Sequence, residues 1–259
     1  MRIRATLGVA TGALALTVVA VPAAQADEIR GDTTISNISV NGGKPVVVGA
    51  SATKTITVSF TVKDDSGVDK AMALPYHGAN LDSADSAALP HTEDDFSVCT
   101  KVNATTANCT ANYPFVPGGN AINKVAGGWK LWVFASGKDG DYVQKENAKS
   151  FSLQRLSKLT VNASPEPVKK GKTLTVTGKL TRANWDANKY SGYSGQSVKL
   201  QYRKKGSSTY TTLKTIKTNT YGDLKTTVTA SADGYYRYSF AGTSTTPAVS
   251  AAGDYVDVQ

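Results

Sequence analysis

The sequence predicts an all-β protein in which a signal peptide precedes two tandem β-sandwich domains. The first 26 residues have the layout of an export signal. The rest of the chain alternates short runs of β-branched and aromatic residues with turns rich in Gly, Asn, Asp and Ser, which is typical of strands. No segment after the signal shows the 3.6-residue period of an amphipathic helix. With 259 residues, the chain has room for two domains of ordinary size.

The N-terminus reads MRIRATLGVATGALALTVVAVPAAQADE. Arg2 and Arg4 supply a basic region, an uncharged apolar run extends from Leu7 to Val21, and the small residues before Asp27 form an A-x-A cleavage box. Because the apolar run is short for a membrane span, cleavage of residues 1–26 is favoured over an uncleaved anchor. We expect a secreted protein, extracellular or associated with the cell wall, with no membrane segment after cleavage.

Residues 27–155 are expected to form the first sandwich. The run KTITVSFTV alternates apolar residues with Thr and Ser, which indicates a strand with one buried face. In GWKLWVFASG both faces are apolar, with Trp129 on one and Trp132 on the other, which suggests a central strand that packs twice. The strands expected in this domain are Thr33–Val40, Lys54–Val62, Phe96–Lys101, Thr106–Thr110, Trp129–Ala135 and Lys149–Leu153.

The two cysteines, Cys99 and Cys109, are expected to form a structural disulfide. An exported protein meets oxidising conditions, and an even count favours a bridge. The residues between them read as a turn, so the cysteines can face each other across a hairpin at a suitable Cα separation. A redox pair or a metal site is the alternative, but the spacing is not C-x-x-C and only His77 and His91 could supplement the sulfurs.

Residues 156–259 are expected to form the second sandwich. Seven short runs with turn signals between them predict an immunoglobulin-like arrangement. Tyr236 opens one run two residues after a glycine, which makes it a candidate tyrosine corner. The expected strands are Lys158–Ala163, Thr173–Leu180, Ser197–Arg203, Tyr210–Lys217, Leu224–Ala230, Tyr235–Ala241 and Asp254–Val258.

Three segments of the second half, VTGKLTRANW, KLQYRKKGSSTYTTLKT and DGYYRYSFAGTSTTPAVSAAGDYVDV, resemble an immunoglobulin-like module common in secreted bacterial proteins of unknown role. The resemblance covers about residues 160–258. In the first half, VSFTVKDDSGVD and GGWKLWVFASGKDGD look like a more divergent immunoglobulin-like domain. The resemblance implies the fold and export, and it brings no catalytic residues with it.

Charge is distributed unevenly between the two domains. Residues 27–155 carry 12 basic and 14 acidic residues, a net charge of −2, whereas residues 156–259 carry 15 basic and 6 acidic residues, a net charge of +9. A basic domain in an exported protein favours acidic polymers as partners. We therefore expect the second domain to attract cell-wall polymer, glycan or another extracellular polyanion.

The candidate ligand-binding residues lie between Leu180 and Tyr210. Residues 181–195 are expected to form a loop longer than a sandwich needs, and aromatic rings there can stack on bases or on apolar sugar faces. The alternative is that the rings pack on the core and the lysines protect strand edges. The candidates are Trp185, Lys189, Tyr190, Tyr193, Arg203, Lys204 and Lys205.

Catalysis is not expected. The sequence contains no G-x-S-x-G elbow, no H-E-x-x-H zinc motif and no phosphate-binding glycine loop. Its two histidines, His77 and His91, lie in polar segments where a solvated side chain is the simplest interpretation. No cofactor is therefore required for the predicted function, and the protein is expected to be a monomer.

Two alternative functions remain open at the level of sequence. A structural spacer stabilised by calcium would use acidic clusters at the strand ends, although D-x-S-G is also an ordinary turn signal. An inhibitor of extracellular hydrolases would present the disulfide-stapled loop Lys101–Asn108, since a rigid loop loses little entropy on docking. The acidic clusters are Asp64, Asp65 and Asp69; Asp139 and Asp141; and Glu93, Asp94 and Asp95.

Overall fold

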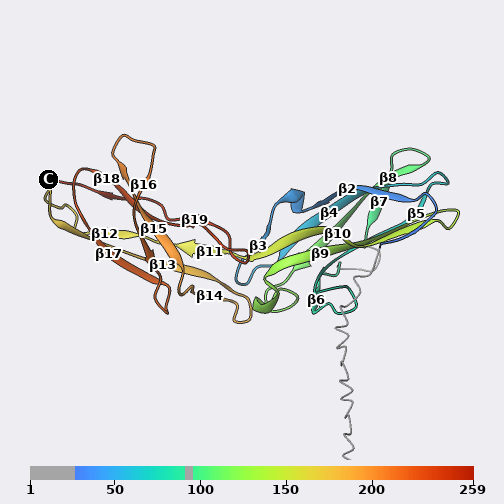
Figure 1. The fold of residues 1–259 in the computed structure, drawn as a ribbon, viewed down its shortest axis with the longest axis horizontal. Helices are drawn as coiled ribbons and strands as arrows, with labels where there is room; N and C mark the ends of the chain where they lie inside the picture. Colours follow the sequence, from blue (N-terminus) through green and yellow to red (C-terminus); the bar gives the residue numbers. More distant parts are fainter. Residues whose placement is uncertain (1–26, 91–95) are drawn as a thin grey trace, which may run out of the picture.

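The computed structural model describes residues 27–90 and 96–259. The predicted signal peptide, His91 and the acidic cluster Glu93–Asp95 lie outside the described residues. Figure 1 shows two β-sandwiches that follow one another along the long axis of the molecule. The predicted all-β fold of immunoglobulin-like sandwiches is confirmed. No helix among the described residues is long and apolar enough to cross a membrane.

The first sandwich consists of a six-stranded and a four-stranded sheet. The six-stranded sheet has the order β1 (Glu28–Arg30), β10 (Tyr142–Arg155), β9 (Gly127–Gly137), β5 (Val68–His77) and β6 (Ser86–Ala87), and β3 (Val46–Val48) pairs in parallel with β10. The four-stranded sheet has the order β2 (Thr34–Val40), β4 (Lys54–Lys63), β8 (Thr106–Phe115) and β7 (Val98–Lys101). Two 3₁₀ turns, η1 (Asn41–Gly43) and η3 (Asn123–Val125), complete the domain.

The alternation of apolar residues places the core between these sheets. On β4 the residues Ile56, Val58, Phe60 and Val62 are each at most 2% exposed. Facing them, Trp129 of β9 packs edge-on against Phe115 with ring centroids 5.0 Å apart, and such pairs add to the stabilisation by area burial. The predicted strand in KTITVSFTV therefore has its expected buried face.

The prediction that β9 packs on both faces is wrong for its outer face. β9 is central, with β10 on one side and β5 on the other. Its outward rings, Trp132 and Phe134, are only half-buried and lie parallel to each other with centroids 6.3 Å apart. No second layer of described strands covers them, because the four-stranded sheet lies on the opposite face.

The second sandwich also has two sheets. In the first, β13 (Thr173–Asn184) pairs with β11 (Ser157–Leu159), β12 (Asn162–Ser164), β14 (Lys189–Gly192) and β17 (Asp223–Thr229). In the second, the order is β16 (Thr211–Lys217), β15 (Ser197–Lys204), β18 (Gly234–Phe240) and β19 (Val249–Ser250), with β20 (Asp254–Val256) also on β18. Leu174, Val176, Leu180, Val198, Leu200 and Tyr238 are all fully buried between the sheets.

The predicted tyrosine corner at Tyr236 does not form, because no described residue accepts a hydrogen bond from its hydroxyl. Tyr236 is buried, but the hydroxyl that reaches the loop before β18 is that of Tyr202, which donates to the carbonyl oxygens of Ala232 and Asp233 at 3.0 Å each. Tyr202 and Tyr236 pack together with ring centroids 5.0 Å apart. Burial raises the pKa of Tyr236, with a smaller contribution from Tyr202.

Candidate functional site

The predicted loop at residues 181–195 is instead a β-hairpin. β13 continues to Asn184 and pairs with β14 through Thr181↔Gly192, Arg182↔Ser191, Ala183↔Tyr190 and Asn184↔Lys189. The turn between these strands carries Trp185, which is fully buried within the core cluster of the first domain. The extra length of this segment therefore joins the two domains.

Trp185 is not a ligand contact. Its indole N–H donates to the carbonyl oxygens of Gly49 at 2.9 Å and Val48 at 3.4 Å, and its backbone N–H donates to Asn123 Oδ1 at 3.0 Å. Asn123 in turn donates its backbone N–H to Asp186 Oδ1 at 2.9 Å. The one polar group of the indole, its N–H, is used within the protein, and the side chain is fully buried, so no surface of this ring can face a ligand.

Both tyrosines at this hairpin also make contacts within the protein. Tyr193 is 9% exposed and packs edge-on against Phe240 in the second core, with Arg182 3.8 Å above its ring. Tyr190 packs against the first core, and the Lys158 ammonium lies 3.8 Å from its ring centroid. The prediction of an aromatic ligand platform at these rings is therefore wrong, because the rings line the domain junction.

Arg155, the last residue of β10, is a buried cation at this junction. It is 8% exposed, and its Nε donates to the carbonyl oxygen of Ala183 at 2.6 Å. Burial and, to a smaller extent, the nearby Arg182 lower the pKa of its guanidinium to about 10, while Asp186 acts in the opposite direction. The group is thus charged at neutral pH and helps to fasten β13 to the end of β10.

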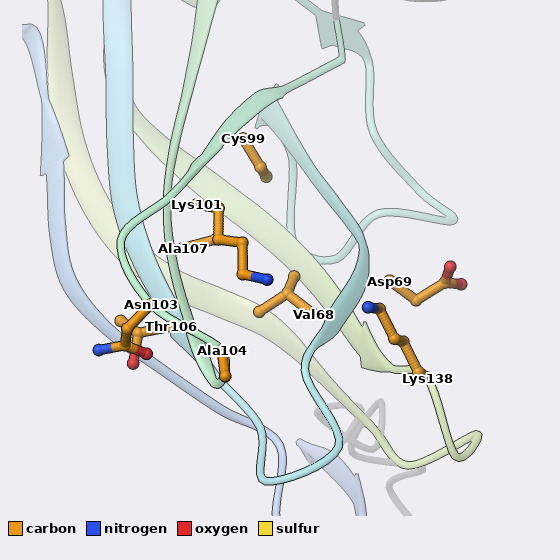
Figure 2. Close-up of a pocket in the computed structure, with 9 residues that line it drawn as sticks. All are labelled: Val68, Asp69, Cys99, Lys101, Asn103, Ala104, Thr106, Ala107 and Lys138. Atoms are coloured by element: carbon orange, nitrogen blue, oxygen red, sulfur yellow. The ribbon is translucent and has the colours of Figure 1, made fainter.

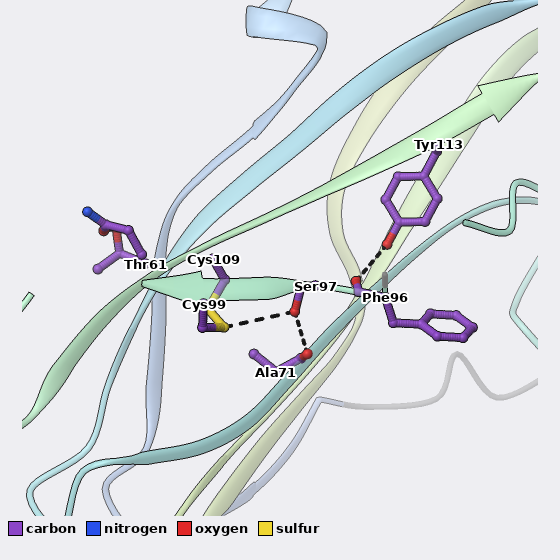
Figure 3. The surroundings of a disulfide bond; sticks show 8 residues. Thr61, Ala71, Phe96, Ser97, Cys99, Cys109 and Tyr113 are labelled. Atoms are coloured by element: carbon purple, nitrogen blue, oxygen red, sulfur yellow. Dashed lines mark hydrogen bonds between the residues drawn. A yellow bond between two sulfur atoms is a disulfide. The ribbon is translucent and has the colours of Figure 1, made fainter. Parts of the chain in front are cut away.

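The predicted disulfide between Cys99 and Cys109 is confirmed, with an S–S distance of 2.03 Å. The two residues face each other across β7 and β8. Figure 3 shows the surroundings: the Ser97 hydroxyl lies beside the Cys99 sulfur and donates to the carbonyl of Ala71, and the Tyr113 hydroxyl reaches the carbonyl of Phe96. The bridge thus fixes the edge of the four-stranded sheet. The loop beyond it is exposed, but the structure assigns it no inhibitory role.

Two members of one predicted acidic cluster, Asp64 and Asp65, meet Asp32, which is not among the residues predicted from the sequence, at one end of the first domain. One carboxylate oxygen from each of Asp32, Asp64 and Asp65 lies within 4.8 Å of the others. Asp64 is 1% exposed and accepts hydrogen bonds from Thr33 Oγ1 at 2.5 Å and from the Ser66 hydroxyl. The cluster has the oxygen ligands that calcium requires, yet its most buried carboxylate already serves as the acceptor that closes a turn.

A second group of titratable side chains comprises His77, Asp85 and Lys124. His77 Nδ1 lies 2.5 Å from Asp85, and Lys124 lies 3.1 Å from the same carboxylate. The hydrogen bond from His77 and, to a smaller extent, that from Lys124 hold the pKa of Asp85 low against the effect of burial. No serine or cysteine nucleophile completes a triad with this pair among the described residues.

A different set of aromatic and basic residues meets on the outer face of the β16-β15-β18 sheet, and we call it the arginine–tyrosine face. Tyr210 lies between two guanidinium groups, with the Arg237 group 3.7 Å and the Arg203 group 5.3 Å from its ring centroid. Arg203 also lies 4.1 Å from the ring of Tyr235. The face therefore comprises Arg203, Tyr210, Tyr235 and Arg237, with Lys205 and Tyr255 beside it.

Neighbouring groups hold this stack in place. Arg237 Nε donates to the Gln201 side chain at 2.9 Å, and an Arg203 N–H donates to the carbonyl oxygen of Ser207 at 2.5 Å. Gly253 lies under Tyr210, where a Cβ would be 2.3 Å from the tyrosine hydroxyl. A side chain at Gly253 would displace the ring, so this glycine permits the close approach.

Neither arginine of the face forms an ion pair among the described residues, whereas Lys205 pairs with Asp233 at 3.4 Å. A guanidinium stacked on a ring keeps its N–H edge free for hydrogen bonds. Both arginines are half-buried, which lowers the entropy that ordering them on a ligand would cost. The remaining N–H groups of both guanidinium groups have no carboxylate partner among the described residues.

The sequence prediction thus identified part of this face. Arg203 lies on it and Lys205 at its margin, while Lys204 is exposed at the end of β15. Lys189 belongs to β14 in the other sheet and is not brought to it. Tyr210, Tyr235 and Arg237 were missed, although the alternation in GYYRYSF places Tyr235 and Arg237 opposite the buried tyrosines.

Comparison with known proteins finds likeness in solved structures alone. No family model matches the chain, and no curated protein shows significant sequence similarity to it. The D00-D0 domain of intimin has a TM-score of 0.28 and 14% identity, covering 86% of this chain and 99% of that chain. The Yersinia pseudotuberculosis adhesin InvE has a TM-score of 0.28 and 12% identity, covering 86% of this chain and 58% of that chain. At these TM-scores the likeness identifies neither a ligand nor an activity.

Proposed function

We propose that this protein is an exported, non-catalytic binding module whose second domain holds anionic polymers on the arginine–tyrosine face. The observation that carries the proposal is the pair of stacked guanidinium groups of Arg203 and Arg237, which have no carboxylate partner among the described residues. The excess of positive charge in residues 156–259 supports the same conclusion.

The chemistry of the face favours phosphate, sulfate or carboxylate groups repeated along a chain. Guanidinium groups bind such oxyanions through two parallel hydrogen bonds, and these charge-assisted bonds are stronger than neutral ones. The tyrosine rings add a surface on which a sugar or base can lie. A polymer contacts both arginines and the surrounding lysines together, so several weak contacts combine along the chain.

Export is supported by two features of the chain. The N-terminal sequence has the layout of a signal peptide, and the Cys99–Cys109 bridge is of the kind that persists in oxidising compartments. An exported binding module with a basic face would meet anionic cell-wall polymers or polyanions of the surroundings. Adhesion to such a surface is the role that we propose.

Binding of the full protein to long-chain polyphosphate and to dextran sulfate tests the proposal, measured by titration at low and at high salt. Arg203→Gln with Arg237→Gln should weaken binding roughly tenfold, because two solvent-screened ion pairs of about 0.7 kcal/mol each are lost. Arg203→Lys with Arg237→Lys keeps the charge and should recover only part of the loss, since lysine lacks the planar fork. Affinity should fall steeply with salt.

The matched control is Arg30→Gln, which removes an exposed arginine from β1 of the first domain. It should leave binding unchanged. If Arg30→Gln weakens binding as much as a single change in the arginine–tyrosine face, the interaction reflects overall charge and the proposed site is wrong. Failure to bind either polymer or washed cell wall at low salt would overturn the function itself.

A further inference from the structure

One side of the first sandwich is open along two strands. β7 is the edge strand of the four-stranded sheet, and all four of its residues are exposed. In the facing sheet, β6 pairs with β5 only at Tyr76 and His77. The stretch Val68–Leu74 of β5 therefore has no neighbouring strand on that side among the described residues, and the two strand edges border the same opening.

Two neighbouring hollows lie in this opening, and we refer to them together as the groove. The first has a volume of about 170 Å³ and is lined by Val68, Asp69, Lys101 and Lys138 among others. The second, of about 510 Å³, is lined by Lys70, Met72 and Phe96 among others. Asp69 and Cys99 line both hollows, so the two lie side by side next to β7.

The register of the disulfide decides which main-chain groups of β7 point away from β8, toward the free edge of the sheet. Cys99 and Cys109 are directly opposite each other with a Cα–Cα distance of 4.0 Å, which corresponds to a non-hydrogen-bonded pair in an antiparallel ladder. The N–H and C=O of Cys99 therefore point away from β8, and by alternation so do those of Lys101. Consistent with this register, Val102 donates its N–H back to Thr106 across the hairpin at 2.9 Å.

β5 offers fewer free acceptors than β7. The carbonyl oxygen of Ala71 accepts the Ser97 hydroxyl, and that of Ala73 accepts the Tyr113 hydroxyl. Figure 3 shows the first of these bonds beside the disulfide. At Cys99 and Lys101 of β7, an incoming strand would thus find main-chain donors and acceptors with which no described strand pairs.

The groove also has a distinct charge. In Figure 2 the ammonium groups of Lys101 and Lys138 both point toward the space over Val68. Lys70 borders the neighbouring hollow, and Asp69 is the single acid among the lining residues. Two ammonium groups on either side of one apolar floor favour a carboxylate between them.

We propose that this groove binds an extended peptide segment that pairs with the free edge of β7 and places an acidic side chain between Lys101 and Lys138. Strand addition to an exposed edge gives affinity through main-chain hydrogen bonds, and pockets for alternate side chains give specificity. The apolar floor at Val68 accommodates the stem of the acidic side chain. This site lies in the first domain and is independent of the polymer-binding face.

The probe is an acetylated and amidated pentapeptide, Thr-Val-Glu-Val-Thr, added at low millimolar concentration to the full protein labelled with ¹⁵N. Backbone amide shifts should be confined to β7 and to Val68–Lys70. The same peptide with Gln in place of Glu should bind roughly fivefold more weakly, which is the effect of losing one screened ion pair. N-methylation of its alternate amides, which blocks the main-chain bonds to β7, should abolish binding.

Two sets of variants assign the charge contact. Lys101→Gln with Lys138→Gln should lower the affinity for the Glu peptide until it equals the affinity for the Gln peptide. The affinity for the Gln peptide should not change. Lys149→Gln, an exposed lysine on β10 of the same domain, should change neither. Equal binding of the Glu and Gln peptides, shifts located elsewhere, or no shifts at all would overturn the proposal. Shifts of β7 amides on concentrating the protein alone would also overturn it, since they would assign the edge to a second copy of this chain.

Discussion

Replacing Trp185 by alanine should separate the two domains and destabilise the first one. The side chain is fully buried among residues of the first domain, although the second domain contributes it. Truncating a buried tryptophan costs about 3–5 kcal/mol through lost burial and the cavity left behind. The carbonyl oxygen of Gly49 loses its partner as well, which adds about 1 kcal/mol.

The expected change in melting temperature follows from these values. A cost of about 4 kcal/mol in a domain of this size corresponds to a fall of roughly 12–20 °C. In calorimetry, the transition of the first domain should move down by this amount while that of the second domain stays nearly in place. Small-angle scattering of the folded variant should show a broader distribution of interdomain distances.

The matched control is Trp132→Ala, which removes a half-buried tryptophan from the outer face of β9. Because less apolar surface is lost, it should cost no more than about 1.5 kcal/mol. Trp185→Phe should fall between the two, since it keeps most of the packing and loses the indole N–H. If Trp132→Ala lowers the melting temperature as much as Trp185→Ala, or if Trp185→Ala leaves both melting and scattering unchanged, the junction does not depend on this side chain.

Two further predictions concern the first domain. Burial alone would raise the pKa of Asp64, but hydrogen bonds from Ser66 and Thr33 lower it, so ionised Asp64 contributes stability that is lost as pH falls through its folded pKa. Repulsion by Asp32 raises the pKa of Asp65, so ionised Asp65 costs stability. Thermal melts at neutral pH should show a lower melting temperature for Asp64→Asn and a higher one for Asp65→Asn, with both differences shrinking at acid pH. A shift of both variants in the same direction would contradict this account. A rise in the melting temperature of the wild type on adding calcium would show that the cluster binds the ion. Replacing both cysteines by serine should cost about 2–3 kcal/mol by loop-closure entropy, measured by urea denaturation, and an unchanged midpoint would show that the hairpin is fixed by its other contacts.

The sequence predicted strands well where one face of the strand is buried within its own domain. KTITVSFTV and GYYRYSF alternate strictly, and both became the expected strands β4 and β18. β5 was missed because Asp69 and Lys70 lie near its start, it has small residues at Ala71 and Ala73, and it contains a proline. Its buried face is recognisable only beside β9, with which it pairs.

The candidate site was only partly predictable, because contacts between distant segments decide it. Trp185 sits between polar residues and resembles an exposed loop tip, but the atoms that bury it belong to the other domain. Tyr210 follows a turn, and only the pairing of β15 with β18 brings it over Arg203 and Arg237. Charge composition pointed to the domain that carries the proposed site, whereas strand register identified the residues of that site.

The hairpin of β13 and β14 has a mechanical consequence. The chain passes between the domains once, at Leu156, whose N–H donates to the carbonyl oxygen of Val48 at 2.9 Å. The indole of Trp185 binds the same short segment from the other side. Tension pulling the second domain away from the first would therefore be resisted by the Leu156–Val48 hydrogen bond at the covalent crossing and by the docked hairpin. The junction would extend only after both of these non-covalent contacts are broken.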